Sequence, residues 1–352
     1  MNNNNINIKT LNNNFFSLTT NYKPNLIRTK ITNYSHFSIN EANIAHKIKQ
    51  IPYYQNFFSI LEDYEELNVS ELNDNIIEKL KNVDEIKYFL FKYYDKGYYD
   101  FTDFLYNSIS IKKLIFDIIT SFQHILYGLH KLDENNISFF NISPNNLVFL
   151  SNYKEKPVLS NFNFSLQLDK LDYTYISHIL NRIEDFTYLP FEIHILYHFI
   201  KHKLVTISYS FIEEFCHEYV DNLNILRLFS DNYRKKYKEQ CISVMKNYIN
   251  RPRKDIIEDI LERNDKWDVY GISMLYLQIF GCISRVFTLS GTFISKIILE
   301  LSKNLNPNSD NRMTLEKTLN EFNRLLNDQD DWSFVNSLDN KKINQLFDEL
   351  SK

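Results

Sequence analysis

The spacing of apolar residues changes near Gly97, and this change limits the chain to a two-part α+β architecture. Over residues 85–91 polar and apolar residues alternate and aromatic residues are frequent, which predicts a half-buried strand. Over residues 109–132 apolar residues recur every three or four positions, which predicts a long amphipathic helix. Helical spacing then returns repeatedly between residues 191 and 301. We therefore expect a small mixed front portion followed by a larger, mainly helical portion.

The front portion also contains a predicted helix over residues 39–51. Ser38 is a good N-cap residue, Glu41 stands three positions later as in a capping box, and Pro52 ends the apolar periodicity. Residues 26–32 predict an extended run, and residues 147–150 and 158–159 predict a later pair of strands. Further helices are expected over residues 99–106, 191–202, 210–222, 231–249, 255–261, 267–280 and 293–301.

Composition excludes several classes of protein. The 352 residues are 44% hydrophobic and 15% aromatic, which is enough for a buried core. The formal net charge of −4 gives no overall basic field, so we expect no nucleic-acid partner. Cys216, Cys241 and Cys282 are too few and too far apart for a disulfide framework. Since no segment offers about 18 uninterrupted apolar residues, we expect no membrane span and a cytoplasmic location.

The frequencies of glycine and asparagine indicate two features of the first hundred residues. Only five glycines occur and none precedes Gly97, so the front portion holds no glycine-rich phosphate loop. Residues 1–20 are rich in Asn, and this composition predicts a flexible tail that buries too little apolar surface to become ordered.

The stretch ISFFNISPNN, residues 137–146, follows a helix that contains LYGLHKL and has the outline of a phosphate-transfer loop. It resembles the catalytic loop of the eukaryotic-type protein kinase family, and more closely that of the divergent kinase-like proteins of large DNA viruses. The resemblance places Phe139 and Phe140 on the family's His and Arg, Asn141 on the catalytic Asp, Ser143 on the Lys and Asn146 on the metal-binding Asn. The loop therefore matches in length while its charged residues are replaced.

Motifs further along the chain extend the resemblance over roughly residues 26–326. Fifteen residues beyond Asn146, the triplet Asn161-Phe162-Asn163 falls on the metal-binding D-F-G, of which only Phe162 survives. YLPFE, residues 188–192, resembles the end of the activation segment, and DKWDVY, residues 265–270, resembles the start of a buried helix. The family pairs the arginine at the position of Arg312 with the glutamate at the position of Glu192. Because removing one member of a buried ion pair is strongly destabilising, retention of both predicts an intact fold. Structural roles are assigned to Phe139, Phe162, Glu192, Asp265, Trp267 and Arg312.

In the front portion the resemblance implies a strand lysine paired with a helix glutamate. Lys30 is the candidate lysine, with Arg28 on the same strand face as the alternative, and Glu41 is the candidate partner. Tyr93 and Tyr94 fall in the segment that joins the two lobes. The implied nucleotide-binding set is Lys30, Glu41, Tyr93, Tyr94, Asn146 and Asn161, of which Asn146 and Asn161 would hold a metal ion.

The resemblance implies a bilobal protein-kinase-like α+β fold, with a small mixed N-lobe and a large, mainly helical C-lobe. We expect a tail over residues 1–20, the N-lobe over 21–94, the C-lobe over 95–327 and a C-terminal amphipathic helix over 328–352. Residues 194–264 form a helix-rich segment that is longer than the usual connection and resembles the viral branch of the family.

Phosphoryl transfer depends on a positioned base, positive charge near the phosphate and a metal ion. The amide of Asn141 cannot accept a proton near neutral pH, Ser143 carries no charge, and Asn161 offers a neutral oxygen where Mg²⁺ prefers a carboxylate. We therefore expect a catalytically impaired pseudokinase that acts as a scaffold or regulator.

The expected pseudokinase would bind ATP weakly, bind Mg²⁺ weakly or not at all, and act through protein partners that the sequence does not identify. Two alternatives stay open. One is a weakly active or atypical serine/threonine protein kinase that transfers the ATP γ-phosphate to protein, and the other is a non-catalytic protein-interaction module. If the chain is viral, its expected location is the host cell cytoplasm.

A group of histidines offers a different hypothesis. His194, His198 and His202 recur at every fourth position and share one helix face, and His217 follows. Such spacing could present imidazoles to zinc. The sequence holds no H-E-x-x-H motif, so histidines on a partly exposed helix face remain the alternative.

The end of the chain predicts an amphipathic helix, in which Ile343, Leu346, Phe347 and Leu350 share one face. This helix could pack back on the large lobe or bind a partner helix or groove.

Hydroxyl groups of the predicted activation segment, on Thr174, Tyr175, Ser177 and Thr187, could be phosphorylated. Phe140 stands where the family has the arginine that binds such a phosphate, so we expect no switch of that kind.

Overall fold

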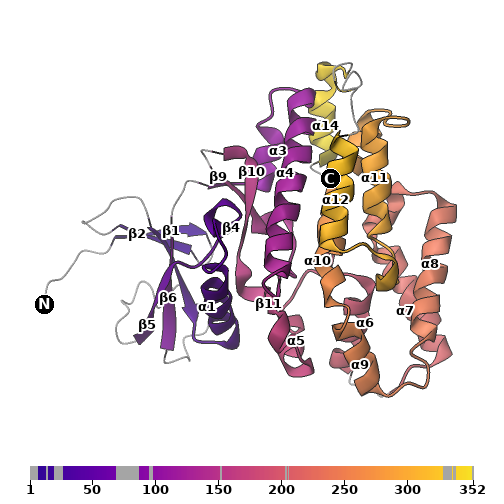
Figure 1. Cartoon of the computed structure of the whole chain (residues 1–352), viewed down its shortest axis with the longest axis horizontal. Helices are drawn as coiled ribbons and strands as arrows, with labels where there is room; N and C mark the ends of the chain where they lie inside the picture. The colour runs from indigo at the N-terminus through magenta and orange to yellow at the C-terminus, as the bar shows by residue number, and fades with distance from the viewer. Residues whose placement is uncertain are drawn as a thin grey trace, which may run out of the picture.

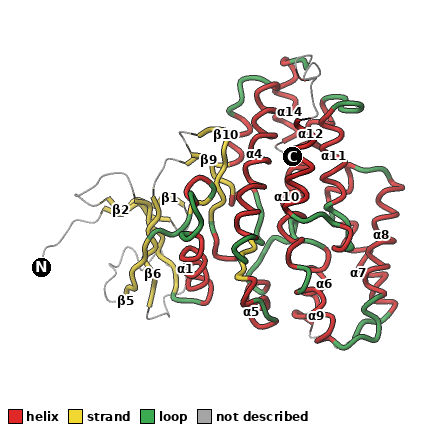
Figure 2. The backbone as a smooth tube through the Cα atoms, in the orientation of Figure 1, coloured by secondary structure: helices red, strands yellow, loops and turns green. Residues whose placement is uncertain are grey.

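A sheet-rich portion and a helix-rich portion lie side by side along the long axis of the molecule (Figure 1). The computed structural model describes residues 7–12, 15–19, 27–68, 87–94, 98–150, 153–202, 204, 206–327, 335 and 338–350. Strands gather in the first part of the chain, and helices form most of the remainder (Figure 2). The predicted bilobal α+β architecture, with a small mixed lobe and a large helical lobe, is therefore confirmed.

The first sheet has five strands in the order β1-β2-β3-β6-β5, each antiparallel to its neighbour. Phe89, Phe91 and Tyr93 are buried on one face of β6, because alternate side chains of a strand point the same way. In the register of β3 and β6, Lys30 lies opposite Phe91. The strands are β1 (Asn7–Asn12), β2 (Phe15–Thr19), β3 (Ile27–Asn33), β5 (Asp63–Asn68) and β6 (Lys87–Tyr94).

The prediction of a flexible tail over residues 1–20 is wrong for two segments, since Asn7–Asn12 and Phe15–Thr19 form β1 and β2. Backbone pairing explains the difference. β2 extends the edge of β3, with Phe15 opposite Lys30 and Phe16 opposite Thr29. The backbone ladder does not depend on side-chain polarity, and aromatic residues favour strands. The Asn-rich composition therefore gave no sign of β1 and β2, which form by pairing with a neighbouring strand.

Helix α1 (His36–Ile48) lies between the first sheet and the helical lobe (Figure 1). Its N-cap is Ser35, so the predicted cap at Ser38 is wrong by three residues. Ser35 Oγ accepts from the Ser38 amide at 3.4 Å, and Ser38 Oγ accepts from the Ser35 amide at 2.9 Å. This reciprocal pair is a capping box made by two serines. Glu41 therefore lies inside the helix, where it is buried.

A second sheet lies against the helical lobe, with the strand order β4-β10-β9-β7. The predicted strand pair is confirmed, since Leu147–Leu150 (β9) and Tyr153–Ser160 (β10) pair antiparallel. The helix expected from residue 99 starts two residues later, because Asp100 caps α3 (Phe101–Tyr106) by accepting from the Asp103 amide at 2.7 Å. The other strands are β4 (Phe58–Ser59) and β7 (Tyr98–Asp100), and a separate small sheet pairs β8 (Ile137–Ser138) with β11 (Leu166–Gln167).

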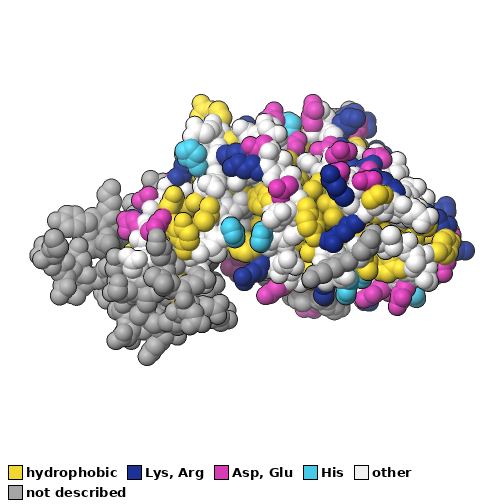
Figure 3. Space-filling model, turned by 90° about the horizontal axis from the view of Figure 1, so that it is seen from below, with side chains coloured by type: hydrophobic (Ala, Val, Ile, Leu, Met, Phe, Trp, Pro, Cys, Tyr) yellow, Lys and Arg dark blue, Asp and Glu magenta, His cyan; other side chains and the backbone are white. Residues whose placement is uncertain are grey.

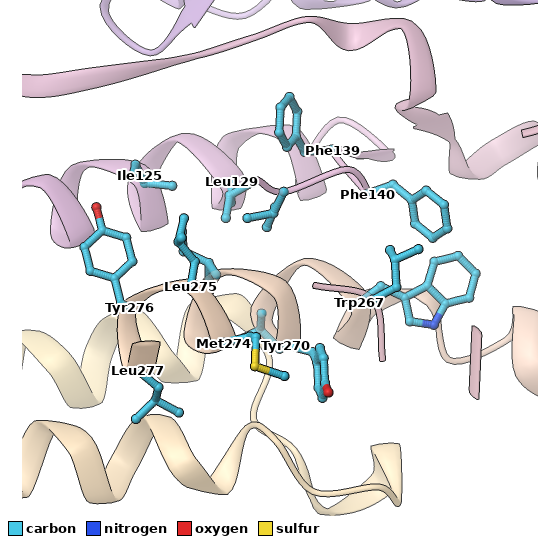
Figure 4. Close-up of a cluster of buried hydrophobic side chains, with 14 of the residues drawn as sticks. Ile125, Leu129, Phe139, Phe140, Trp267, Tyr270, Met274, Leu275, Tyr276 and Leu277 are labelled. Carbon is cyan, nitrogen blue, oxygen red and sulfur yellow. The ribbon is translucent and has the colours of Figure 1, made fainter. Parts of the chain in front are cut away.

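Two long helices, α4 (Ile111–Asp133) and α10 (Trp267–Val286), form the centre of the helical lobe. Leu275 and Tyr276 of α10 reach toward Ile125 and Leu129 of α4 (Figure 4). The Tyr276 hydroxyl lies 2.8 Å from Ser121 Oγ, which gives both buried hydroxyl groups a partner. One described helix, Asn264–Val286, is long and apolar enough to cross a membrane, but 78% of its most apolar window is buried inside the protein.

The enlarged segment after residue 190 consists of four helices at the far end of the lobe (Figure 1). The helix α5, which precedes this segment, was not predicted. The helices expected over residues 191–202, 210–222, 231–249, 255–261 and 293–301 are all present. The bounds are α5 (Tyr173–Leu180), α6 (Phe191–His202), α7 (Tyr209–Asn222), α8 (Asp231–Lys246), α9 (Arg253–Leu261), α11 (Phe293–Lys303) and α12 (Leu315–Asn327).

The C-terminal helix α14 (Ile343–Leu350) packs back on the large lobe beside α10. Leu346 is fully buried, and the Tyr106 hydroxyl donates to the Phe347 carbonyl at 3.2 Å. Arg285 of α10 forms an ion pair with Glu349 at 3.2 Å. Of the two hypotheses for this helix, the structure therefore shows packing on the lobe. Most of residues 328–337, which the predicted segment also includes, lies outside the described residues.

Candidate nucleotide site

Glu41 of α1 is the centre of a buried network in the small lobe. Lys30 Nζ lies 3.3 Å from Glu41 Oε2, and the Tyr93 hydroxyl donates to Glu41 Oε1 at 2.6 Å. Both carboxylate oxygens therefore have a partner, as a carboxylate that is only 3% exposed requires. The side chain of Arg28, the alternative to Lys30, lies outside the described part of the chain.

Tyr93 was predicted to lie where the lobes join and to contact nucleotide. Its hydroxyl donates to Glu41 inside the small lobe, and its contact with nucleotide stays a prediction. The strand alternation contains the signal for this, because Tyr93 follows the buried Phe89 and Phe91 at a spacing of two residues. The side chain of Tyr94 lies outside the described part, so its predicted contact with nucleotide stays a prediction.

Three asparagines of the predicted catalytic and metal positions lie together at the junction between the lobes. Asn146 Nδ2 donates to the main-chain carbonyl of Asn141 at 2.7 Å, and Asn161 Nδ2 donates to Asn146 Oδ1 at 3.0 Å. The two side chains predicted to hold a metal ion are therefore hydrogen-bonded to each other. Ser143 lies at the start of the short turn Pro144–Asn146 and carries no charge.

This donor set does not fit Mg²⁺. Asn146 Oδ1 already accepts a hydrogen bond, and Asn161 supplies a neutral amide in place of the carboxylate that a hard dication prefers. Among the residues that the structure describes, no three His, Cys, Asp or Glu side chains form a group that could hold a metal ion.

The backbone of the loop is held in an unusual conformation at two positions. Phe140 has φ 62° and Asn161 has φ 66°, both in the left-handed region that a bulky residue such as Phe rarely adopts. The carboxylate of Asp268 accepts from the Phe139 and Phe140 amides, each at 2.7 Å. Burial raises the pKa of Asp268 to about 6, and the two amides partly oppose that rise. Asp268 thereby holds the loop from the start of α10.

The structural role predicted for Asp265 thus belongs to Asp268. Asp265 lies before α10 and pairs with the neighbouring Lys266 near the surface. Asp268 lies in the first turn of the helix, where its carboxylate faces the loop. Trp267 is buried, and its ring lies 5.4 Å from that of Phe140. The sequence offers both aspartates within four residues, and only their place relative to the helix start separates them.

Two further predicted structural residues pack around the loop. Phe162 is buried and meets the ring of Phe139 edge-on, with ring centroids 5.1 Å apart. Deeper in the lobe, Arg312 donates two hydrogen bonds to the Glu192 carboxylate, each at 2.7 Å. Arg312 Nε also donates to the Asn306 carbonyl at 2.7 Å. This pair is fully enclosed and bidentate, which is the geometry that a buried ion pair needs.

Sequence reasoning missed Asn40, which joins α1 to the segment after Asn163. Asn40 Nδ2 donates to the Ser165 carbonyl at 2.8 Å, and Asn40 Oδ1 accepts from the Tyr175 hydroxyl at 2.7 Å. Asn40 is 5% exposed and lies beside Glu41 on α1. Its bonds hold α1 in the orientation in which Glu41 meets Lys30. A polar residue on the buried face of a predicted helix was the only available signal.

The zinc hypothesis for the histidines is not supported within the described residues. The rings of His198 and His202 are tilted to each other with centroids 4.3 Å apart, and His217 pairs instead with Asp221 of its own helix at 3.2 Å. Of the predicted phosphorylation sites, Tyr175 is half-buried by its contacts with Asn40, and Thr174 and Thr187 are exposed. Phosphorylation at these positions stays a prediction.

The Lys30 and Glu41 contact and the Glu192 and Arg312 pair occur where the resemblance predicted them, within a bilobal protein-kinase-like fold. No protein-family model and no curated protein sequence matches the chain. A solved structure titled "Titin kinase and its flanking domains" is similar to it, with a TM-score of 0.47 and 11% sequence identity. The similarity covers 96% of this chain and 47% of that chain. The chain thus spans about half the length of the solved chain that it matches.

Proposed function

We propose that the chain is a pseudokinase, a kinase-like protein that does not transfer phosphate and acts as a scaffold or regulator. One observation carries the proposal. The two side chains at the metal positions, Asn146 and Asn161, are neutral amides hydrogen-bonded to each other at 3.0 Å. A metal ion would have to break this bond and would gain no carboxylate in return.

The absence of a base supports the same proposal. Asn141 stands where phosphoryl transfer needs a group that accepts the substrate hydroxyl proton, and an amide does not accept it near neutral pH. The neighbouring Ser143 brings no positive charge to a transferring phosphate. Together with the missing carboxylate at Asn161, three separate requirements of the chemistry are therefore unmet.

Metal-independent nucleotide binding is compatible with the rest of the site. The Lys30 side chain is 12% exposed and carries a positive charge, and its Nζ lies 3.3 Å from Glu41 Oε2. A phosphate would share that charge with Glu41, so we expect weak ATP binding. Retention of the Lys30 and Glu41 contact is also what favours the second candidate, a weakly active serine/threonine protein kinase.

The expected partners of the scaffold are proteins in the cytoplasm, or in the host cell cytoplasm if the chain is viral. On the face drawn in Figure 3, Lys and Arg side chains lie among Asp and Glu side chains, with hydrophobic side chains between them. A surface of mixed charge suits protein partners better than nucleic acid, which requires a basic surface.

A paired phosphotransfer assay tests the proposal. Autophosphorylation and transfer to a generic protein substrate are measured for the wild type and for the double variant Asn141→Asp with Asn161→Asp. Asn145→Asp is the matched control, since Asn145 is an exposed asparagine in the same loop. We expect no transfer by the wild type or the control. Robust magnesium-dependent transfer by the wild type would overturn the proposal in favour of the kinase.

Thermal unfolding with ATP tests the nucleotide separately. We expect a small rise in Tm that is the same with and without Mg²⁺, because ligand binding stabilises the native state according to its affinity. A large rise that requires Mg²⁺ would show that the amide pair does accept a metal ion.

A further inference from the structure

A cavity of about 350 Å³ lies in the enlarged helical segment, and no residue of the asparagine loop (residues 137–146 together with Asn161) lines it. Its walls come from α6 and α7, from the end of the segment before α6, and from α10. This volume is within the range of pockets that hold small molecules or single side chains of a partner. None of the groups assigned to nucleotide binding lines it.

Five rings belong to the cavity wall: Phe186, His194, His198, Phe215 and Tyr219. The ring centroids of His194 and Tyr219 are 4.9 Å apart, and those of His198 and Phe215 are 5.2 Å apart. Phe186 closes the other side, with its centroid 5.6 Å from that of His194. The rings thus form two groups in the cavity wall, one of Phe186, His194 and Tyr219 and one of His198 and Phe215, with tilted and edge-on contacts within each group.

The charge of this lining is negative. Glu218 is the only carboxylate, ammonium or guanidinium group among the described residues that line the cavity. Burial lowers the pKa of His194 to about 4 and also lowers the pKa of His198, so both rings are neutral near pH 7. The nearby Lys201 lies over the ring of Tyr197, outside the lining.

We propose that this cavity binds an organic cation, namely a guanidinium or ammonium group on an apolar stem. Aromatic rings attract a cation through their negative faces, and the attraction grows where water is excluded. The Glu218 carboxylate supplies the counter-charge, and the apolar stem covers the remaining wall. The site is independent of phosphate transfer and of the proposed function.

Two sources could supply this chemistry, an arginine or lysine side chain of a protein partner and a free small amine. The probes for them are acetyl-Ala-Arg-Ala-amide and agmatine, each titrated into the full chain by calorimetry at pH 7.5. The matched neutral probe is the same tripeptide with citrulline in place of arginine, which keeps the shape and removes the charge.

We expect at least one cationic probe to bind saturably, and the citrulline peptide to bind at least about tenfold more weakly. Stronger binding of the arginine peptide assigns the site to a partner's side chain, and stronger binding of agmatine assigns it to a free amine. Equal binding of the arginine and citrulline peptides, or no saturable binding of either cation, would overturn the proposal.

Variants on α7 locate the binding. Glu218→Gln should weaken binding about fivefold or more, and Phe215→Leu should weaken it while keeping an apolar wall. Glu213→Gln is the matched control, because Glu213 is exposed on the same helix and does not line the cavity. Unfolding curves for all three variants show whether each is folded. If Glu218→Gln is folded and binds as the wild type does, the assignment is wrong.

Discussion

The Glu192 and Arg312 pair and the asparagine loop lie in the same lobe but differ in charge. The pair consists of two charged side chains, whereas the loop has neutral side chains at the positions predicted for catalysis and metal binding. Glu192 and Arg312 keep full charges, joined by two hydrogen bonds of 2.7 Å in a buried place. Asn141, Asn146 and Asn161 are neutral, and the Asn146 side chain donates to the Asn141 main-chain carbonyl and accepts from the Asn161 side chain. Charge persists where its loss would leave a buried partner unpaired. It is absent where it would act only on a ligand, and amide hydrogen bonds maintain the shape of the loop.

The largest effect should come from breaking the ion pair. Arg312→Met leaves the Glu192 carboxylate buried without a partner, so we expect the free energy of unfolding to fall by about 3–5 kcal/mol. Urea unfolding measures the change. Arg324→Met, in the exposed pair with Glu321, is the control and should cost less than about 1 kcal/mol. Equal losses in the two variants would mean that the buried pair does not hold the fold.

The second test compares two aspartates at the start of α10. Asp268→Ala should lower the free energy of unfolding by about 2–4 kcal/mol, because the buried amides of Phe139 and Phe140 lose their acceptor. Asp265→Ala should change it by less than about 0.5 kcal/mol, since Asp265 is near the surface. Urea unfolding of both variants decides the matter. A greater loss for Asp265→Ala would return the structural role to that residue.

His194 is a buried ionisable group of a third kind, because its ring is neutral near pH 7. Its pKa is lowered to about 4 by burial, and its Nε2 has no hydrogen-bond partner within the described part of the protein. The unfolded chain binds this proton more readily, so the stability contributed above about pH 6.5 is lost as the pH falls toward 4. The loss should reach about 3 kcal/mol.

The pH effect is measured by urea unfolding at pH 7 and pH 5. His194→Gln should reduce the dependence on pH. Asp268 opposes this trend, because its raised pKa of about 6 gives stability that is present below about pH 4 and lost as the pH rises through 6. An unchanged pH dependence in His194→Gln would show that the ring is not neutral through burial.

The smallest effect should come from restoring one charge to the loop. Asn161→Asp removes the donor to Asn146 Oδ1 and places a carboxylate oxygen against that acceptor. We therefore expect the free energy of unfolding to fall by about 1 kcal/mol without metal. Mg²⁺ should recover that loss in the variant and leave the wild type unchanged. Thermal unfolding with and without Mg²⁺ measures both. Stabilisation of the wild type by Mg²⁺ would show that the neutral asparagine loop binds a metal ion, which contradicts this prediction.

Long periodic segments were the most predictable part of this fold. The apolar spacing over residues 109–132 and 267–280 identified α4 and α10, because a helix that is buried along its length needs many apolar residues in register. The Asn-rich start was misread because β1 and β2 are ordered by a neighbouring strand, which a local composition does not record. Caps depend on single residues, and Ser35 and Ser38 are equally good candidates from the sequence.

The site was predicted in outline and corrected in detail. Motif order located Lys30, Glu41 and the asparagine loop, whereas the structural role given to Asp265 is filled by Asp268, which accepts from the Phe139 and Phe140 amides. Asn40 was missed because its partners, Ser165 and Tyr175, lie more than a hundred residues away in the chain. Such contacts follow from tertiary packing and leave no local pattern.

The Asn40 contacts have a consequence for how the molecule opens. Tyr175 of α5 and Asn40 of α1 are bonded, Lys47 of α1 pairs with Asp169 at 2.7 Å, and the rings of His36 and His178 stack with centroids 5.2 Å apart. Helix α1 therefore cannot swing away without releasing α5 from it. In amide hydrogen exchange the two helices should behave as one cooperative unit that spans both lobes, and protection should be lost from both at the same denaturant concentration.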